Sequence, residues 1–408
     1  MTPETLLTKS GTHTQLTIVA ALLAMLGPFS IDTYLPSFPA IGQELAMSRT
    51  ALSHSLSVYL AAFGISTLFW GPMSDRYGRR LVILISLSTY VLASVGCAFA
   101  DSSVDFLTYR SLQGLGASGG FIAGRAMIRD AHTAAYAQKA MSHVMLLFSV
   151  APALAPIIGG WLQDLSGWRS IFWFLCAYAA VLIWLTVQTR ETLSVSARRS
   201  FHPAYVGRIY LRTLSHVRFN ALSLSLSFSF GGLFLYIAGA PTVIYDFLNL
   251  GTRDFALLFV PMVAGLMAGA YLSSTIAVSW NTQRIILLGF SLLSLSVFIN
   301  LLLVFNFPSS PITVIGPLVI YTFGLAFIMP AITVLALDCF PENRGSAASM
   351  QGFIQMSTNA LVASVAVPVL HHHIQHFVSG QLVLLVISFA LWIVAYRINL
   401  KTVGDKYA

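Results

Sequence analysis

Residues 71–80 read Gly71-Pro-Met-Ser-Asp75-Arg76-Tyr-Gly78-Arg79-Arg80 and lie between two long apolar runs. This short stretch concentrates a carboxylate and several guanidinium groups in a chain that is otherwise very apolar. The flanking runs, residues 51–73 and 81–99, are each long enough to cross a bilayer. We therefore expect the stretch to form a tight turn at a membrane surface, joining two spans on the side that carries positive charge.

The composition excludes a water-soluble protein. Apolar residues make up 57% of the chain and charged residues 9%, whereas soluble proteins carry about 25% charged residues. A net charge of +8 would suggest nucleic-acid binding in a soluble protein, but in a membrane protein positive charge collects in cytoplasmic loops. The cysteines at 97, 176 and 339 are isolated, so they predict packing residues and neither a metal site nor a disulfide framework.

Twelve apolar stretches approach the 20 or so residues that a transmembrane helix needs. They are residues 16–37, 51–73, 81–100, 104–127, 139–163, 169–189, 219–243, 254–277, 285–306, 312–336, 346–369 and 379–398. Helices are expected because they satisfy their own backbone hydrogen bonds in lipid. No convincing small-residue cleavage site follows the first stretch, so we expect it to be a retained span and not a signal peptide.

The connections between these stretches are short except for one basic segment, which divides the spans six and six. We predict an all-α membrane protein with two six-helix bundles related as a pseudo-repeat. The expected parts are an N-terminal bundle (residues 1–190), a cytoplasmic basic linker loop (191–218) and a C-terminal bundle (219–408).

The positive charges predict the orientation. With the N-terminus placed inside, eighteen of the 22 lysines and arginines fall on the inner side and only Arg49, Arg169 and Arg253 on the outer side. The remaining cation, Arg110, lies within a span. This bias predicts that both termini are cytoplasmic.

Asp32 lies within the first predicted span, between Pro28 and Pro36. A carboxylate inside a span costs about 2.5–3.5 kcal/mol on insertion scales and is a functional candidate by default. It could bind and release a proton as its surroundings alternate, and the two prolines allow the helix to bend or end there. The alternative is that Asp32 is simply solvated among the outer lipid headgroups.

Arg110 is the expected partner of Asp32 in proton coupling. It shares a helix face with Gln113 and Gly114, which follow at i+3 and i+4. A guanidinium does not usefully lose its proton, so within a span it must find acceptors in the protein. Arg110 could tune Asp32, position a proton carrier or only fasten two spans together.

Small residues mark two spans. Gly116, Gly120 and Gly124 recur every fourth residue, a spacing that lets helix backbones approach closely in lipid. The span at 139–163 answers with Pro152, Pro156, Gly159 and Gly160. We expect a tight seam in which two conformations can interchange.

The second half differs from the first, because residues 285–337 and 345–396 contain no Asp, Glu, Lys or Arg. Proton chemistry is therefore expected in the N-terminal half, with shape and apolar contact supplied by the C-terminal half. The candidates for substrate contact in both halves are Tyr34, Tyr59, Gln113, Phe148, Phe228, Tyr236, Met262, Tyr321, Gln355 and Met356.

Several alternatives are disfavoured by what the chain contains. The tract His371-His-His-Ile-Gln-His376 has no acidic or cysteine neighbour in sequence, so we expect a solvated loop and no metal site. The sequence has no phosphate-binding lysine loop that would indicate ATP, and no catalytic constellation at a membrane surface. We expect no enzyme activity and no cofactor, with the proton gradient as the energy source.

The chain resembles the major facilitator superfamily over nearly its whole length. Residues 71–80 match the signature of the loop between spans 2 and 3, residues 110–116 (Arg-Ser-Leu-Gln-Gly-Leu-Gly) that of span 4, and residues 155–160 (Ala-Pro-Ile-Ile-Gly-Gly) that of span 5 in antiporters. Together with Asp32-Thr-Tyr-Leu-Pro36 and residues 124–130 (Gly-Arg-Ala-Met-Ile-Arg-Asp), these motifs are similar to those of the bicyclomycin-resistance branch of drug:proton antiporters.

The resemblance implies alternating access driven by protons, with Asp32 and Arg110 as the responsive pair. It also implies a conformational latch that holds the two halves in the outward-facing state. The residues of this latch are Gly71, Asp75, Arg76, Gly78, Arg79, Arg80, Arg125, Arg129 and Asp130.

The function predicted is a proton-coupled antiporter that exports drugs or other small amphipathic molecules. Alternatives are a dedicated exporter of a metabolite such as a siderophore or amino-acid derivative, an uptake symporter, or a membrane sensor that transports nothing. We expect a monomer in a bacterial cytoplasmic membrane whose partners are a drug-like substrate, protons and lipid, with no nucleic acid.

Overall fold

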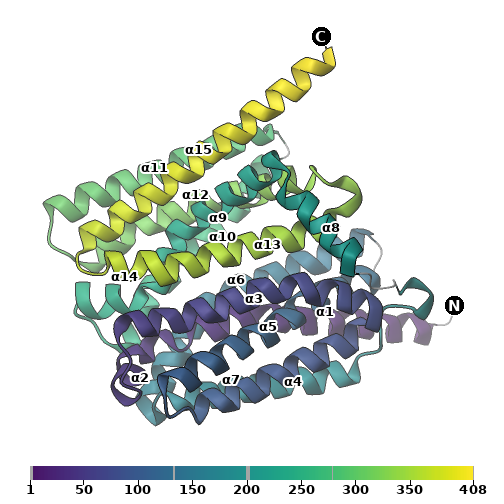
Figure 1. Ribbon diagram of the computed structural model, residues 1–408, viewed down its shortest axis with the longest axis horizontal. Helices are drawn as coiled ribbons and strands as arrows, with labels where there is room; N and C mark the ends of the chain where they lie inside the picture. Colours follow the sequence, from purple (N-terminus) through teal and green to yellow (C-terminus); the bar gives the residue numbers. More distant parts are fainter. Residues whose placement is uncertain (1–2, 132–133, 199–202, 278, 408) are drawn as a thin grey trace. The chain divides into compact units, whose positions relative to one another are not determined.

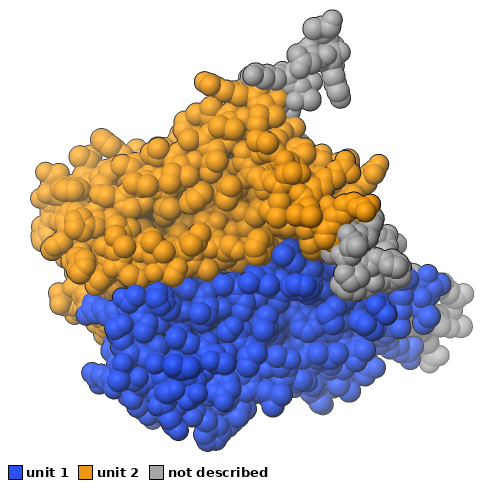
Figure 2. All heavy atoms as spheres, viewed as in Figure 1, with its two compact units in different colours: residues 1–206 blue, residues 207–408 orange. Residues whose placement is uncertain are grey.

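The computed structural model describes the backbone of residues 3–131, 134–198, 203–277 and 279–407. Throughout these ranges the regular elements are helices (Figure 1), so the all-α prediction is confirmed. The chain divides into two compact units, Met1–Val206 and Gly207–Ala408, which are coloured separately in Figure 2. Each unit is described by itself below.

The first unit is built on six long helices within its described part. They are α1 (Pro3–Asp32), α3 (Arg49–Tyr77), α4 (Arg79–Ala98), α5 (Ser103–Ala131), α6 (Ala134–Ser166) and α7 (Arg169–Gln188). Between α1 and α3 lie a 3₁₀ turn, η1 (Leu35–Ser37), and the short helix α2 (Phe38–Glu44). A further 3₁₀ turn, η2 (Val195–Ala197), follows α7.

The second unit repeats this plan, with two of its spans interrupted by π-helical segments. Its long helices are α9 (Val217–Ala238), α10 (Phe255–Ile276), α11 (Thr282–Asn306), α12 (Pro311–Leu337), α13 (Arg344–Leu361) and α15 (Ile374–Tyr407). The π-helical segments are η3 (Thr242–Phe247) after α9 and η6 (Val362–Ala366) after α13, the latter continuing into α14 (Val367–Leu370). Two 3₁₀ turns, η4 (Thr252–Asp254) and η5 (Pro341–Asn343), precede α10 and α13.

Eleven helical segments of the described chain are long and apolar enough to cross a membrane. The twelfth predicted span, residues 104–127, corresponds to α5, which is 29 residues long but falls outside this set. Helix α5 packs against α1, α3 and α4. Its glycines and the polar residues Arg110, Gln113 and Ser118 are buried against protein, which explains why a span of low apolarity lies inside the unit.

The two units share one packing pattern. In the first unit α5 packs against α1, α3 and α4; in the second, α12 packs against α9, α10 and α11 in the same way. Likewise α1 contacts α6 and α7, while α9 contacts α13 and α15. The predicted pair of six-helix pseudo-repeats is therefore present in the structure.

Side-chain caps and one glycine fix several helix ends. Ser48, Asn281 and Ser310 accept hydrogen bonds from the first turns of α3, α11 and α12, which satisfies backbone donors that the helix cannot. Gly78 has φ +101°, a conformation that other residues rarely adopt, and it separates α3 from α4. The expected turn over 71–80 is thus wrong in extent, because residues 71–77 continue α3.

Two further expectations differ from the structure. The segment predicted as a basic linker loop, 191–218, contains the helix α8 (Pro203–Leu214). The first span was expected to run to residue 37, but α1 ends at Asp32. Lys9, Arg199, Lys401 and Lys406, which contributed to the predicted orientation, lie outside the residues whose side chains are described.

Candidate functional site

Asp32 is the last residue of α1, at the point where the chain leaves the helix. Its side chain is buried, with 3% of the residue exposed, and its Oδ1 atom has no hydrogen-bond partner. Pro28 lies one turn earlier, inside α1, and Pro36 lies in η1. The alternative of a solvated carboxylate is therefore wrong for this structure. Of the two possibilities left open at the prolines, a bend or an end, the structure has an end, and it comes before residue 37, the predicted limit of the span.

Arg110 is fully buried on α5 and is enclosed by two aromatic rings. Its guanidinium carbon lies 4.2 Å from the ring centroid of Tyr34 and 4.6 Å from that of Tyr59, so the rings attract the cation through their π faces. Its Nη1 donates to Gln113 Oε1, and Gln113 Nε2 donates to Ser94 Oγ at 2.7 Å. Three side chains predicted to contact substrate, Tyr34, Tyr59 and Gln113, thus surround Arg110.

The predicted pairing of Asp32 with Arg110 is not present as an ion pair. Both residues lie in the described part of the chain, and no salt bridge or hydrogen bond joins them. Arg110 Nε and Nη2 are also without a partner, as is the hydroxyl of Tyr59. A buried charge without an acceptor is costly in a membrane. The site therefore holds unsatisfied polar atoms that a proton, water or ligand can engage.

Hydroxyl groups connect this site to the surrounding helices. Ser30 of α1 lies 2.7 Å from the hydroxyl of Tyr90 on α4, and Tyr34 lies 3.2 Å from Ser55 on α3. Sequence reasoning missed Ser30, Tyr90 and Ser94, whose only signal was their polarity within apolar runs. These hydrogen bonds tie the end of α1 and the residues just after it to α3 and α4.

A second cluster of charges is centred on Arg79, at the start of α4. Arg79 Nε donates to Asp130 Oδ2 at 2.8 Å, and its Nη1 donates to Asp75 Oδ1 at 2.5 Å and to Ser74 Oγ at 2.7 Å. Arg79 itself is 3% exposed. One guanidinium therefore joins α3, α4 and α5 inside the first unit, using three of the residues assigned to the latch.

Four further latch residues of the described chain, Arg76, Arg125, Arg129 and Gly71, do not bond to the Arg79 side chain. Arg76 stacks on the ring of Tyr77 at 5.0 Å, and Arg125 lies over Phe121 at 3.9 Å. Arg129 is exposed, and Gly71 lies within α3. Whether these residues act on the second unit stays a prediction.

Glu191 belongs to the Arg79 cluster and was missed by sequence reasoning. Its carboxylate accepts hydrogen bonds from the backbone nitrogens of Arg79 at 2.9 Å, Arg80 at 3.1 Å and Leu193 at 3.0 Å. A Cβ at Gly78 would lie 2.5 Å from this carboxylate. Because the first backbone donors of a helix have no intrahelical partner, Glu191 caps α4 and fixes the chain after α7 to the turn at Gly78.

We predict that Glu191→Gln lowers the stability of the protein. The substitution keeps the shape but removes the negative charge from the helix N-terminus, at a cost of about 1 kcal/mol. A lower midpoint of thermal unfolding in detergent is the expected result. Glu342→Gln is the matched control, since Glu342 is exposed, and an equal shift in both variants would contradict the capping role.

The seam predicted between the spans 104–127 and 139–163 has other partners in the structure, because the predicted glycines of α5 and Gly159 of α6 pack against α4, α1 and Thr33 and not against each other. We call the close contact of Gly159 beside Asp32 the seam. A Cβ built on Gly159 of α6 would overlap the carbonyl group of Thr33, so the backbones of α6 and of the segment after α1 touch. Pro152 and Pro156 lie inside α6, and the helix continues through both. The glycines of α5 are also packed closely: Gly116 lies against the backbone of Tyr90, and Gly120 and Gly124 lie against Leu23.

The substrate candidates of the second unit fall into two groups. Tyr236, Met262 and Tyr321 are buried; Tyr236 accepts from Asn300 Nδ2 at 3.0 Å, and the Tyr321 hydroxyl donates to the Ser229 carbonyl at 2.8 Å. Phe228, Gln355 and Met356 are half-buried, as is Phe148 on α6 of the first unit. Tyr236 and Tyr321 thus serve helix packing in this structure.

The sequence and the fold both resemble those of known proteins. Residues 20–368 match the family model described as Major Facilitator Superfamily. The chain belongs to this superfamily. The family prediction is therefore confirmed, and the chain is a multi-pass membrane transporter and not an enzyme.

Two curated relatives of this facilitator carry names that refer to drug resistance. The bicyclomycin resistance protein homolog of Haemophilus influenzae is 26% identical over 361 residues, covering 85% of this chain and 87% of the relative. Multidrug resistance protein D of Escherichia coli is 25% identical over 364 residues, covering 88% and 90%. Among solved structures, the xylose transporter XylE of E. coli aligns with a TM-score of 0.73 at 17% identity over 93% of this chain and 95% of that chain, which supports the fold.

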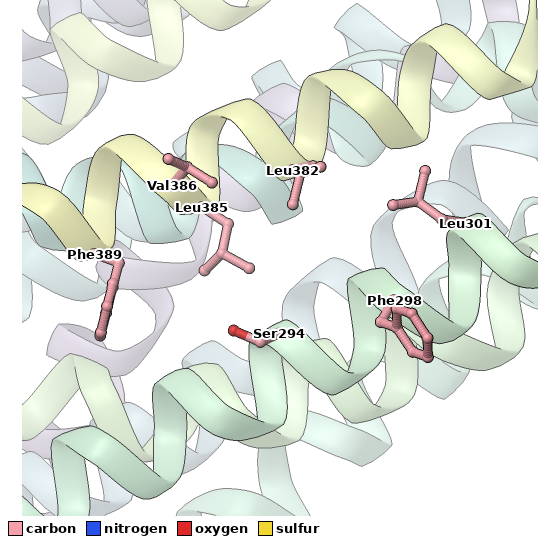
Figure 3. Close-up of a pocket in the computed structure, with 7 residues that line it drawn as sticks. All are labelled: Ser294, Phe298, Leu301, Leu382, Leu385, Val386 and Phe389. Atoms are coloured by element: carbon pink, nitrogen blue, oxygen red, sulfur yellow. The ribbon is translucent and has the colours of Figure 1, made fainter.

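The second unit of this facilitator has an open cavity of about 300 Å³ between α11 and α15 (Figure 3). Its walls are Ser294, Phe298, Leu301, Leu382, Leu385, Val386 and Phe389. The hydroxyl of Ser294 is the polar feature of an otherwise apolar lining. The cavity includes no predicted substrate residue, and Phe298 and Val386 are more than half exposed.

The histidine tract begins in the turn after α14 and runs into the first turn of α15, which contains His376. The rings of His371 and His372 lie 4.0 Å apart, and those of His373 and His376 lie 5.2 Å apart. In the portion of the chain with described side chains, no group of three or more His, Cys, Asp or Glu residues is placed to hold a metal ion.

Proposed function

We propose that this facilitator is a proton-coupled antiporter that exports drug-like, small amphipathic molecules by alternating access. The observation that carries the proposal is Asp32, a buried carboxylate with an unpartnered oxygen at the broken end of α1. A group that must change its protonation state during a transport cycle needs this combination of burial and freedom from a fixed ion pair. The drug-resistance names of the two relatives support the cargo class.

The cycle assigns a role to each cluster of the first unit. Asp32 binds a proton from the outside and releases it inside as cargo moves outward, while Arg110 supplies the positive charge that favours release. The seam at Gly159 is the place where the end of α1 moves during the cycle. The Arg79 cluster fixes the turn between α3 and α4, which is part of the latch that holds the outward-facing state. The predicted setting is a bacterial cytoplasmic membrane with both termini inside, and no cofactor takes part.

Transport by the purified protein in liposomes tests this proposal. We expect uptake of ethidium, a lipophilic cation, or chloramphenicol, an uncharged alcohol and amide, when the liposome interior is made acidic. Nigericin, which collapses the pH gradient, should stop the uptake. Uptake that ignores the gradient would contradict proton coupling, and uptake of one metabolite alone would favour the dedicated exporter.

A further inference from the structure

Helix α13 carries three side-chain amides at one spacing. Gln351, Gln355 and Asn359 follow each other at intervals of four residues, so they lie along one face of the helix. We call these three residues the amide row. They occur in a predicted membrane span, where a polar side chain is costly to bury and is therefore a candidate for a functional role.

Two members of the amide row are buried without full hydrogen bonding. Gln351 is 6% exposed and Asn359 is 1% exposed, while Gln351 Nε2 and Asn359 Oδ1 have no partner. By contrast, the neighbouring hydroxyls of Thr358 and Ser364 donate to carbonyl groups of their own helix at 2.9 and 2.8 Å. Leaving a buried amide unpaired costs about 1–3 kcal/mol. Another molecule that supplied the missing hydrogen bonds would therefore be stabilised by these amides.

The helix changes character directly after the amide row. Helix α13 ends at Leu361, and the π-helical segment η6 begins at Val362. Single π-helical turns inside helices are rare overall, and those that occur are often found at functional sites. This is an independent sign that the row lies at a place where function, and not packing alone, sets the structure.

The charge distribution indicates what the amide row can bind. Residues 345–396 contain no Asp, Glu, Lys or Arg. Arg344, the first residue of α13, is ion-paired with Asp338, so the rest of the helix offers no counter-charge. A side-chain amide both donates and accepts hydrogen bonds. Its complement is an uncharged group such as a hydroxyl, a carbonyl or another amide, whereas Asp32 and Arg110 in the first unit supply charge.

We propose that the amide row is a binding subsite for uncharged hydrogen-bonding groups of the cargo, and that it sets the preference for polar neutral molecules over lipophilic cations. This inference rests on the proposed transport function and names the chemistry of one part of the cargo. Asn359 and Gln351 provide the buried contacts, and the half-buried Gln355 lies between them.

Equilibrium binding to the purified protein tests the subsite without requiring transport. Asn359→Leu and Gln351→Leu are each expected to raise the Kd for chloramphenicol about tenfold, the value of one good hydrogen bond, and to leave the Kd for ethidium within about twofold. Thr358→Val is the matched control, because the Thr358 hydroxyl bonds within its own helix; it should change neither Kd.

Thermal unfolding of the leucine variants shows whether a loss of binding comes from lost ligand contacts or from a destabilised fold. Since Asn359 Oδ1 and Gln351 Nε2 have no partner in the protein, the leucine variants should unfold at or above the wild-type temperature. Unchanged chloramphenicol binding, equal loss of both probes, or a wild-type protein that binds no chloramphenicol would each overturn the subsite. Intact binding without gradient-driven uptake would instead overturn the proposed antiport alone.

Discussion

Asp32→Asn is expected to abolish proton-driven export while drug binding stays within about threefold of wild type. Asparagine keeps the shape of the side chain but cannot take up and release a proton. Because Oδ1 of Asp32 has no hydrogen-bond partner, the substitution removes no contact of that atom, so the fold should survive. The measurement is drug uptake into liposomes under an imposed pH gradient, together with drug binding to the same preparation.

Exchange of labelled for unlabelled drug at equal pH supplies the discriminating readout. Exchange needs the conformational cycle but no net proton movement, so Asp32→Asn should retain it. Asp105→Asn serves as the control, since Asp105 is an exposed carboxylate at the start of α5. Undiminished gradient-driven export in Asp32→Asn would move the proton site to another carboxylate, with Asp75 and Asp130 as the first candidates.

Features that depend on local sequence could be predicted. The prolines around Asp32 remove backbone donors and so indicated a bend or an end of α1 there, although not its last residue. Gly78 marks the break between α3 and α4 because only glycine readily adopts its positive φ. The twelve spans follow from apolar length. Helix α5 could be recognised as a span in spite of its low apolarity, because the regular spacing of its small residues indicated close packing against other helices.

Contacts between distant residues could not be predicted in the same way. Glu191 lies 112 positions after the backbone nitrogen that it caps, and nothing near Glu191 in sequence indicates that partner. Asp32 and Arg110 were expected to pair because opposite charges in spans usually do. The structure instead places Arg110 between Tyr34 and Tyr59, a solution that the aromatic residues permit but the sequence does not specify.

Gly159→Ala is expected to impair both the stability and the conformational cycle of the transporter. The added Cβ would overlap the Thr33 carbonyl, and neither backbone can move aside as a flexible side chain would. Overpacking of this kind costs about 1–3 kcal/mol. The measurement is thermal unfolding of the purified variant together with drug exchange at equal pH, and Gly159→Leu should show larger losses in both.

The seam and the proton site are adjacent, because Thr33 follows Asp32 directly, yet their variants should fail differently. Asp32→Asn removes the proton step and keeps exchange, whereas Gly159→Ala hinders the motion itself and should lose exchange as well. Gly316→Ala on α12 is the control, since a Cβ there meets nothing within 4 Å, and it should leave exchange intact. Full exchange in a stable Gly159→Ala protein would show that the close approach of α6 to α1 only supports packing, and the site of conformational change would then lie elsewhere.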